Sequence, residues 1–300
     1  MIMARQQAIA DADLRLALPE VRTINADDLR DALAKGLDDF RAMPSHVVFL
    51  SLIYPVVGLL FGQLAFGSEL LPILFPLVAG FALIGPLAAI GLYELSRRRE
   101  QGLEASWKQA FGVLRSTSLP AIATLGSLLM AIFIAWLIAA QLIYNGTFGD
   151  VRHTSLSAFA SDIFTTRAGW TLIVVGNAVG FLFAVLAFTI SVVSFPLLLD
   201  RDVGFAAAIA TSARAVLTNP VTMALWGIIV VAALVLGSLP LLIGLAVVMP
   251  ILGHSTWHLY RKVVEPGSIP RSDYRPRPTG RRYAADFPSA LFPWSREKER

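Results

Sequence analysis

Two stretches of the sequence, residues 75–98 (FPLVAGFALIGPLAAIGLYELSRR) and residues 239–262 (LPLLIGLAVVMPILGHSTWHLYRK), follow one plan and decide the fold. Aligned without a gap, they match prolines, glycines and an aromatic position, and both close on paired cations. A helix needs about 20 apolar residues to cross the hydrocarbon core of a bilayer, and each stretch is long enough. The two stretches therefore predict membrane-spanning helices that form part of an internal repeat.

The matched prolines and glycines are candidates for a kink or a cavity. A proline inside a span bends the helix, and broken helices at equivalent positions of two repeats point to a binding cavity. The alternative is a purely structural role, because neighbouring helices often satisfy the backbone groups that a proline frees. The candidate positions are Pro76, Gly80, Pro86, Pro240, Gly244 and Pro250.

The composition indicates a membrane protein. The 300 residues are 56% hydrophobic and 15% charged, with a mean hydropathy of +0.65, whereas soluble domains carry roughly 25% charged residues. Without cysteine, the chain can form neither disulfides nor thiolate metal sites. Six apolar runs are predicted to span the membrane, at about 47–66, 70–96, 119–144, 170–199, 221–236 and 239–260.

The distribution of cations predicts the topology. With a cytoplasmic N-terminus, 23 of the 25 Lys and Arg residues fall on the cytoplasmic side. This is a strong positive-inside bias, and it favours an even number of spans with both termini in the cytoplasm. The prediction is an all-α polytopic bundle of six transmembrane helices whose first and last hairpins are parallel repeats. Because the cations flank the spans, we expect no nucleic-acid partner.

Four regions are expected along the chain. Residues 1–24 are predicted to be flexible, and residues 25–45 to form a cytoplasmic amphipathic helix that Asn25 caps and that packs on the rest of the protein. Residues 46–263 would form the membrane domain, and 264–300 a disordered basic tail. Two polar connectors, near 103–114 and 205–216, are predicted to form interfacial amphipathic helices.

Histidines supply the candidate site residues. His254 and His258 are four positions apart, on one helix face, a spacing that suits a metal. His46 and Glu94 are predicted to lie at the same membrane level, so three readings stay open: a metal site, a Glu94–His258 polar pair, or side chains that anchor helix ends. We favour anchoring, and assign no metal and no cofactor.

The C-terminal half of the chain carries a resemblance, first in GFAAAIATSARAVLTNP (204–220) and then in LGHSTWHLYR (252–261). These stretches, with GLDDFRAMPSH (36–46) before the first span, resemble a bacterial family of predicted integral membrane proteins of unknown function, over about residues 25–265. The resemblance implies a six-span protein of the bacterial inner membrane, and it implies no activity.

The sequence favours a protein without catalytic activity. It contains no nucleophile elbow, HExxH or Walker motif, and no charged residue at the predicted membrane midplane. The first hypothesis is an accessory or assembly partner of a membrane complex, in contact with the lipid bilayer and a membrane-protein partner. The alternative is a permease or binding protein for a neutral or amphiphilic solute or lipid.

Overall fold

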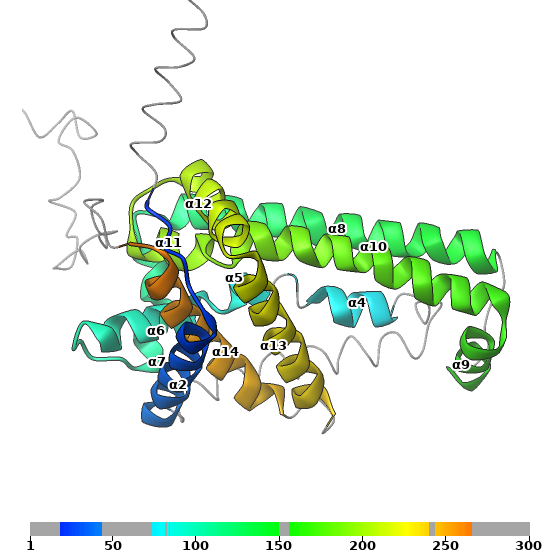
Figure 1. Ribbon diagram of the computed structural model, residues 1–300, viewed down its shortest axis with the longest axis horizontal. Helices are drawn as coiled ribbons and strands as arrows, with labels where there is room; N and C mark the ends of the chain where they lie inside the picture. The colour runs from blue at the N-terminus through cyan, green and yellow to red at the C-terminus, as the bar shows by residue number, and fades with distance from the viewer. Residues whose placement is uncertain are drawn as a thin grey trace, which may run out of the picture.

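The computed structural model describes residues 19–43, 74–81, 83, 85–149, 156–239 and 244–265 (Figure 1). Every element in these ranges is helical, and an isolated antiparallel bridge joins Val21 to Val264. The prediction of an all-α fold is confirmed. The helices are α2 (Ala26–Ala42), α4 (Leu74–Phe81), α5 (Gly85–Ala88), α6 (Ile90–Glu100), α7 (Trp107–Ala110), a 3-10 helix η3 (Phe111–Arg115), α8 (Leu119–Phe148), α9 (Leu156–Thr165), α10 (Arg167–Ser191), α11 (Ser194–Asp200), α12 (Phe205–Thr218), α13 (Pro220–Ser238) and α14 (Leu245–Val263).

Three helical segments in the described part of the chain are long and apolar enough to cross a membrane. They are α8, the run from α10 through α11, and α13. They correspond to the third, fourth and fifth predicted spans. The first predicted span lies outside the described residues, as do residues 1–18 and the tail from 266.

The helices α8 and α10 form a long pair that extends away from α2, α6 and α14, with α4 beside it and α9 at its far end (Figure 1). Trp136 of α8 holds the pair together: its ring packs 5.8 Å from that of Phe183 and approaches Gly180, and its Nε1 donates a hydrogen bond to the Pro76 carbonyl at 2.9 Å. The outer faces are apolar and exposed, with Phe181 67% exposed. An apolar surface of this kind suits a lipid environment.

The fourth predicted span is not one continuous helix. The helix is interrupted at Val192 and Val193, between α10 and α11. Pro196 has no N–H to donate to the Val192 carbonyl, so the regular ladder cannot continue there. Ser212 of α12 repairs part of the gap: it accepts a hydrogen bond from the Val193 N–H at 3.2 Å and donates one to the Thr189 carbonyl at 2.7 Å.

The N-terminal helix α2 begins as predicted. The side chain of Asn25 accepts hydrogen bonds from the backbone N–H groups of Asp27 and Asp28, and the Asp28 carboxylate accepts one from the Asn25 N–H. This capping box fixes the helix start. The helix packs against α14, where a Cβ atom added to Gly36 would lie 2.0 Å from Ser255 Oγ.

The two ends of the described chain meet beside α13. Arg22 N donates to the Val263 carbonyl at 2.7 Å, and Glu265 N donates to the Glu20 carbonyl at 3.0 Å. Asn219 then binds this N-terminal segment, accepting from Ile24 N at 2.8 Å. The segment before α2 and the segment after α14 therefore lie side by side.

The two repeated stretches follow different courses. The first is divided among α4, α5 and α6, whereas α14 continues through Pro250. Their polar ends nevertheless pack closely, since a Cβ atom on Gly253 would lie 2.6 Å from Leu92 Cδ1.

The two connectors also differ. In the first, α7 and η3 leave Phe111 and Leu114 exposed, whereas in the second α12 buries Ala208 and Ser212.

Candidate functional site

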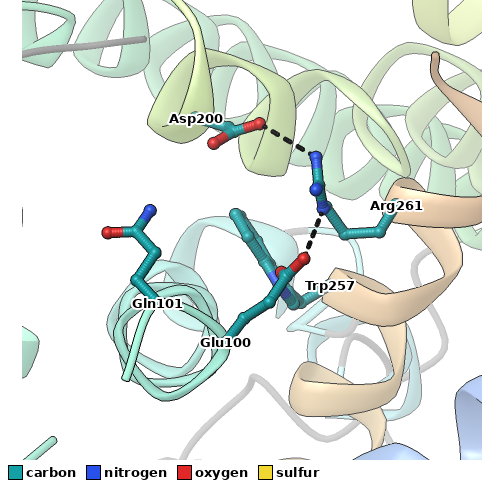
Figure 2. Close-up of a pocket in the computed structure, with 5 residues that line it drawn as sticks. All are labelled: Glu100, Gln101, Asp200, Trp257 and Arg261. Carbon is teal, nitrogen blue, oxygen red and sulfur yellow. Dashed lines mark hydrogen bonds and ion pairs between the residues drawn. The ribbon is translucent and has the colours of Figure 1, made fainter. Parts of the chain in front are cut away.

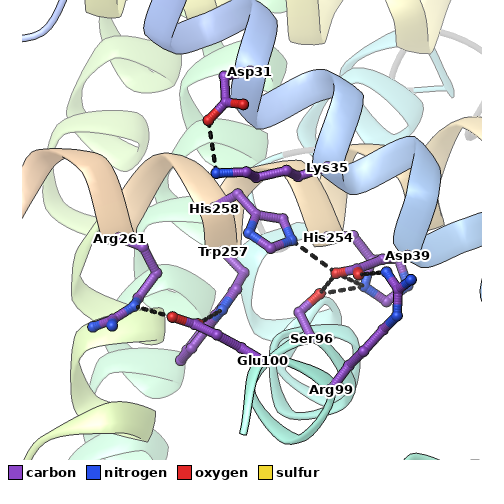
Figure 3. Close-up of polar contacts among 10 residues, drawn as sticks. All are labelled: Asp31, Lys35, Asp39, Ser96, Arg99, Glu100, His254, Trp257, His258 and Arg261. Carbon is purple, nitrogen blue, oxygen red and sulfur yellow. Dashed lines mark hydrogen bonds and ion pairs between the residues drawn. The ribbon is translucent and has the colours of Figure 1, made fainter. Parts of the chain in front are cut away.

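Three helices from distant parts of the sequence bring a group of polar side chains together at one end of the molecule (Figure 3). We call this group the Asp39 cluster. Its members are Asp39 from α2, Ser96 and Arg99 from α6, and His254 and His258 from α14.

The carboxylate of Asp39 is the centre of the cluster. Its Oδ2 lies 2.5 Å from Ser96 Oγ and 2.9 Å from His258 Nε2, while its Oδ1 pairs with Arg99. Ser96 Oγ also lies 2.6 Å from His254 Nδ1. A hydroxyl has a single hydrogen, and an ionised carboxylate only accepts. Ser96 therefore donates to Asp39 and accepts from the Nδ1–H of His254.

The ionised form of Asp39 is strongly favoured. Burial by itself would raise the pKa of Asp39, but hydrogen bonds from His258, Ser96 and Arg99 outweigh it and lower the pKa to about 2. Hydrogen bonds that a carboxylate accepts stabilise its charged form. Asp39 is therefore a buried anion at neutral pH, held by donors from two other helices.

Ser96 and His254 of the cluster are enclosed, whereas the Arg99 side chain is partly exposed. Ser96 is 1% exposed and His254 is fully buried. A serine nucleophile must reach a substrate carbonyl, and this enclosure does not suit such a reaction. The arrangement suits a different task, which is to fix α2, α6 and α14 to one another. Within the described part of the chain, His254 Nε2 and Ser255 Oγ are buried without a hydrogen-bond partner.

Of the predicted site residues, the structure brings His254 and His258 together beside Asp39. His258 contacts the Asp39 carboxylate directly, and His254 is linked to it through Ser96. For the Glu94–His258 pair, one of the three open readings, the structure shows other partners on both sides: His258 contacts Asp39. The carboxylate of Glu94 instead accepts from Arg97 Nε at 2.8 Å and lies 3.6 Å from Arg98. These arginines are three and four positions along the same helix, so they reach the buried carboxylate locally.

The metal hypothesis gains no support from the described residues, where no group of three or more His, Cys, Asp or Glu side chains is arranged to hold an ion. His46, the remaining candidate ligand, lies outside the described residues.

A second polar network joins the same end of α14 to α6 and α11 (Figure 2). Arg261 Nε donates to Glu100 Oε1 at 3.0 Å, and its Nη1 lies 3.5 Å from Asp200 Oδ2. Trp257 Nε1 donates to the other Glu100 oxygen at 3.0 Å, and Tyr260 donates to Asp200 at 2.8 Å. A pocket of about 220 Å³ lies beside this network, lined by Glu100, Gln101, Asp200, Trp257 and Arg261.

The candidate kink residues occupy packed positions. A Cβ atom on Gly80 would lie 2.7 Å from the rings of Phe133 and Trp136, and one on Gly244 would lie 2.7 Å from the Gly237 carbonyl. Both glycines thus allow close helix contacts. Pro86 is half-buried, Pro250 is buried within α14, and Pro240 lies outside the described residues. A cavity among these residues stays a prediction.

Sequence reasoning overlooked Asp39, although the signal was present. The apolar residues of this segment predict a stripe of Leu29, Leu33, Leu37 and Phe40. Of these the structure buries Leu29, together with Ala32, Gly36 and Asp39. These four follow at helical spacings of three and four, so Asp39 shares the buried face. It also lies in one of the segments that carry the family resemblance (36–46), and both histidines lie in another (252–261).

Comparison with known proteins identifies a family. No curated protein and no solved structure matches the chain. Residues 74–200, from the start of α4 to the end of α11, match the model of a family described as "Predicted integral membrane protein (DUF2189)". The match does not include the segments at 36–46, 204–220 and 252–261. Over residues 74–200, which are less than half of the chain, the predicted resemblance is confirmed, and this part of the chain is similar to a family of integral membrane proteins of unknown function.

Proposed function

We propose that this protein is a non-enzymatic accessory or assembly partner of a membrane complex. The observation that carries the proposal is a stripe of small side chains on the exposed surface of α8. Its members recur every four residues and are Ala123, Ser127, Ala131 and Ala135. In membranes, small residues at this spacing let a second helix approach closely.

The neighbouring helix α10 adds a polar group. Asn177 is exposed on a helix that is otherwise apolar there, and its Nδ2 donates to the Ile173 carbonyl at 2.7 Å. The carboxamide oxygen can accept a hydrogen bond from a partner helix, whereas hydrocarbon chains offer it none. The pair of α8 and α10 therefore has the properties of a surface that packs with other membrane helices.

The absence of catalytic activity is part of the proposal. The best-defined polar groups, those around Asp39 and those around Arg261, are engaged with one another across helices. Their arrangement supports a structural role, because each carboxylate serves as the common acceptor for donors from other helices.

A permease for a neutral solute or lipid is the alternative that the paired prolines favour. A permease needs a cavity near the membrane midplane. Gly80 and Gly244 make close helix contacts instead, and the pockets described above lie at the polar end of α14. These observations support the accessory role more than transport.

The membrane placement that goes with this role is six spans in the bacterial inner membrane, with both termini in the cytoplasm. The backbone contact between Val21 and Val264 supports termini on one side, since paired segments must share a side of the bilayer. The cation distribution favours the cytoplasmic side. Single cysteines at exposed positions near these segments, labelled in intact cells with a membrane-impermeant maleimide, test this. Labelling before lysis would contradict it.

Affinity purification from native membranes in mild detergent tests the function, with two matched variants. Ala131→Leu enlarges the small-residue stripe of α8, and Ala232→Leu makes the same change on the exposed face of α13. We expect a stoichiometric membrane-protein partner with the wild type and with Ala232→Leu, and its loss with Ala131→Leu. A co-purifying small molecule in place of a protein would favour the permease, and no reproducible partner would overturn the proposal.

A further inference from the structure

A second pocket, of about 260 Å³, lies at the polar end of α14, and we call it the cup. The two polar networks described above give it no role. Lys35 of α2, Glu100 of α6 and three residues of α14, His258, Arg261 and Lys262, line it. It adjoins the pocket of Figure 2, with which it shares Glu100 and Arg261. Its side chains come from the same three helices that the Asp39 cluster fixes (Figure 3).

Three of the five lining residues are cations, and the single acid is already engaged. Glu100 accepts from Arg261 through Oε1 and from Trp257 through Oε2, each at 3.0 Å. Asp31 holds the two lysines next to each other, since its Oδ2 lies 2.8 Å from Lys35 Nζ and 2.9 Å from Lys262 Nζ.

The cations retain hydrogen-bond donors after these contacts. An ammonium group has three N–H donors and a guanidinium has five. Lys262 uses two donors, on Asp28 and Asp31, and Lys35 uses one, on Asp31. Arg261 uses Nε and Nη1, which leaves Nη2. Donors from three side chains therefore remain available around one small volume.

The position of the cup favours a phosphate. It lies where the apolar part of α14 ends and Arg261 and Lys262 begin, which is the level expected for lipid headgroups. Basic pockets beside membrane helices bind anionic headgroups. His258 adds a polar wall. Its Nε2 donates to the ionised Asp39.

We propose that this cup binds a phosphate-bearing anion, through Lys35, Arg261 and Lys262. An anionic phospholipid headgroup and free phosphate share this chemistry. The inference does not depend on the accessory role proposed above, because a lipid can bind here whether or not α8 packs with a partner.

Native mass spectrometry of the purified full chain tests the proposal, with dioleoyl phosphatidylglycerol and dioleoyl phosphatidylcholine as probes. The wild type should retain one phosphatidylglycerol in preference to phosphatidylcholine. The double variant Lys35→Gln, Lys262→Gln should bind it about thirtyfold more weakly, because each cation near an anionic surface contributes about 1 kcal/mol. The control Arg30→Gln, Arg41→Gln removes two cations from the exposed face of α2 and should bind as the wild type does.

Excess inorganic phosphate distinguishes the two sources. If it displaces the lipid in the wild type, the cup accepts free phosphate, and if it does not, the cup requires the lipid. Lys35→Gln alone serves if the double variant unfolds, because the Lys35 side chain is half exposed and has one acidic partner. Equal phosphatidylglycerol binding by the wild type and the lysine variants, or no preference over phosphatidylcholine, would overturn the proposal.

Discussion

His258 Nε2 lies 2.9 Å from Asp39 Oδ2, although 219 positions separate the two residues. This contact joins the N-terminal helix to the last described helix, and Ser96 extends it to α6. The protein therefore uses one buried carboxylate to fix three helices at its polar end.

Replacing Asp39 with Ala should destabilise the protein by about 3 kcal/mol. The change leaves His258, Ser96 and Arg99 without their common acceptor, and removing one partner of a buried pair typically has a cost of this size. Unfolding in detergent, followed by tryptophan fluorescence, measures the effect. Asp38→Asn is the matched control, because Asp38 is exposed and lies 3.9 Å from Arg41. An equal loss in both variants would contradict a special role for Asp39.

The free energy of unfolding should depend on pH through Asp39. Because its pKa is lowered from 3.8 to about 2, its contribution is fully present above pH 4 and is lost as the pH falls toward 2. Linkage gives about 2 kcal/mol for such a shift. The wild type should lose this amount between pH 4 and pH 2, relative to Asp39→Asn. Parallel pH profiles of the two proteins would show that Asp39 is not held as an anion.

Gly36→Ala should weaken the packing of α2 on α14. The new Cβ atom would lie 2.0 Å from Ser255 Oγ and 2.6 Å from Ser255 N, so the helix must move. Overpacking of this kind costs about 1–3 kcal/mol. Hydrogen exchange of α2 should increase. Gly176→Ala is the control, because a Cβ atom there meets nothing within 4 Å, and we expect no loss of stability from it.

Ser212→Ala should destabilise the interrupted helix by about 1–2 kcal/mol. The variant leaves the Val193 N–H and the Thr189 carbonyl without their hydrogen bonds at the break. Unfolding by a denaturing detergent measures the loss. Ser127→Ala, on the exposed face of α8, should unfold as the wild type does. If both variants match the wild type, Ser212 does not support the break.

A disulfide should form between cysteines placed at Val21 and Val264. The two residues form an antiparallel bridge, whose Cα separation of about 4.5–5.5 Å suits a disulfide. The natural chain has no cysteine, so the pair reacts without competition. A shift in gel mobility on oxidation reports the bond. The pair Val21→Cys, Leu217→Cys tests for random collision, and equal yields would argue against the contact.

The sequence by itself determined the local structure. Asn25 followed by acids at the first turn predicted the start of α2, and the long apolar runs predicted α8 and α13, because capping and hydrophobic length depend on residues that are close in the chain. The interruption of the fourth span could be predicted only in part from the sequence. Pro196 marks where the helical hydrogen bonds fail, but the hydrogen bond that Ser212 of α12 supplies at the break depends on tertiary packing.

The tertiary structure alone decided which polar groups meet. The sequence makes His258 a candidate partner for Glu94, whereas in the structure Arg97 of the same helix donates to Glu94. In the sequence, Asp39 is one of several acids in a polar, charged helix. In the structure, Gly36 lets α2 approach α14 closely, and Asp39 is buried beside His258. The energy of a buried charge depends on donors that arrive from elsewhere in the chain, and linear spacing does not contain that information.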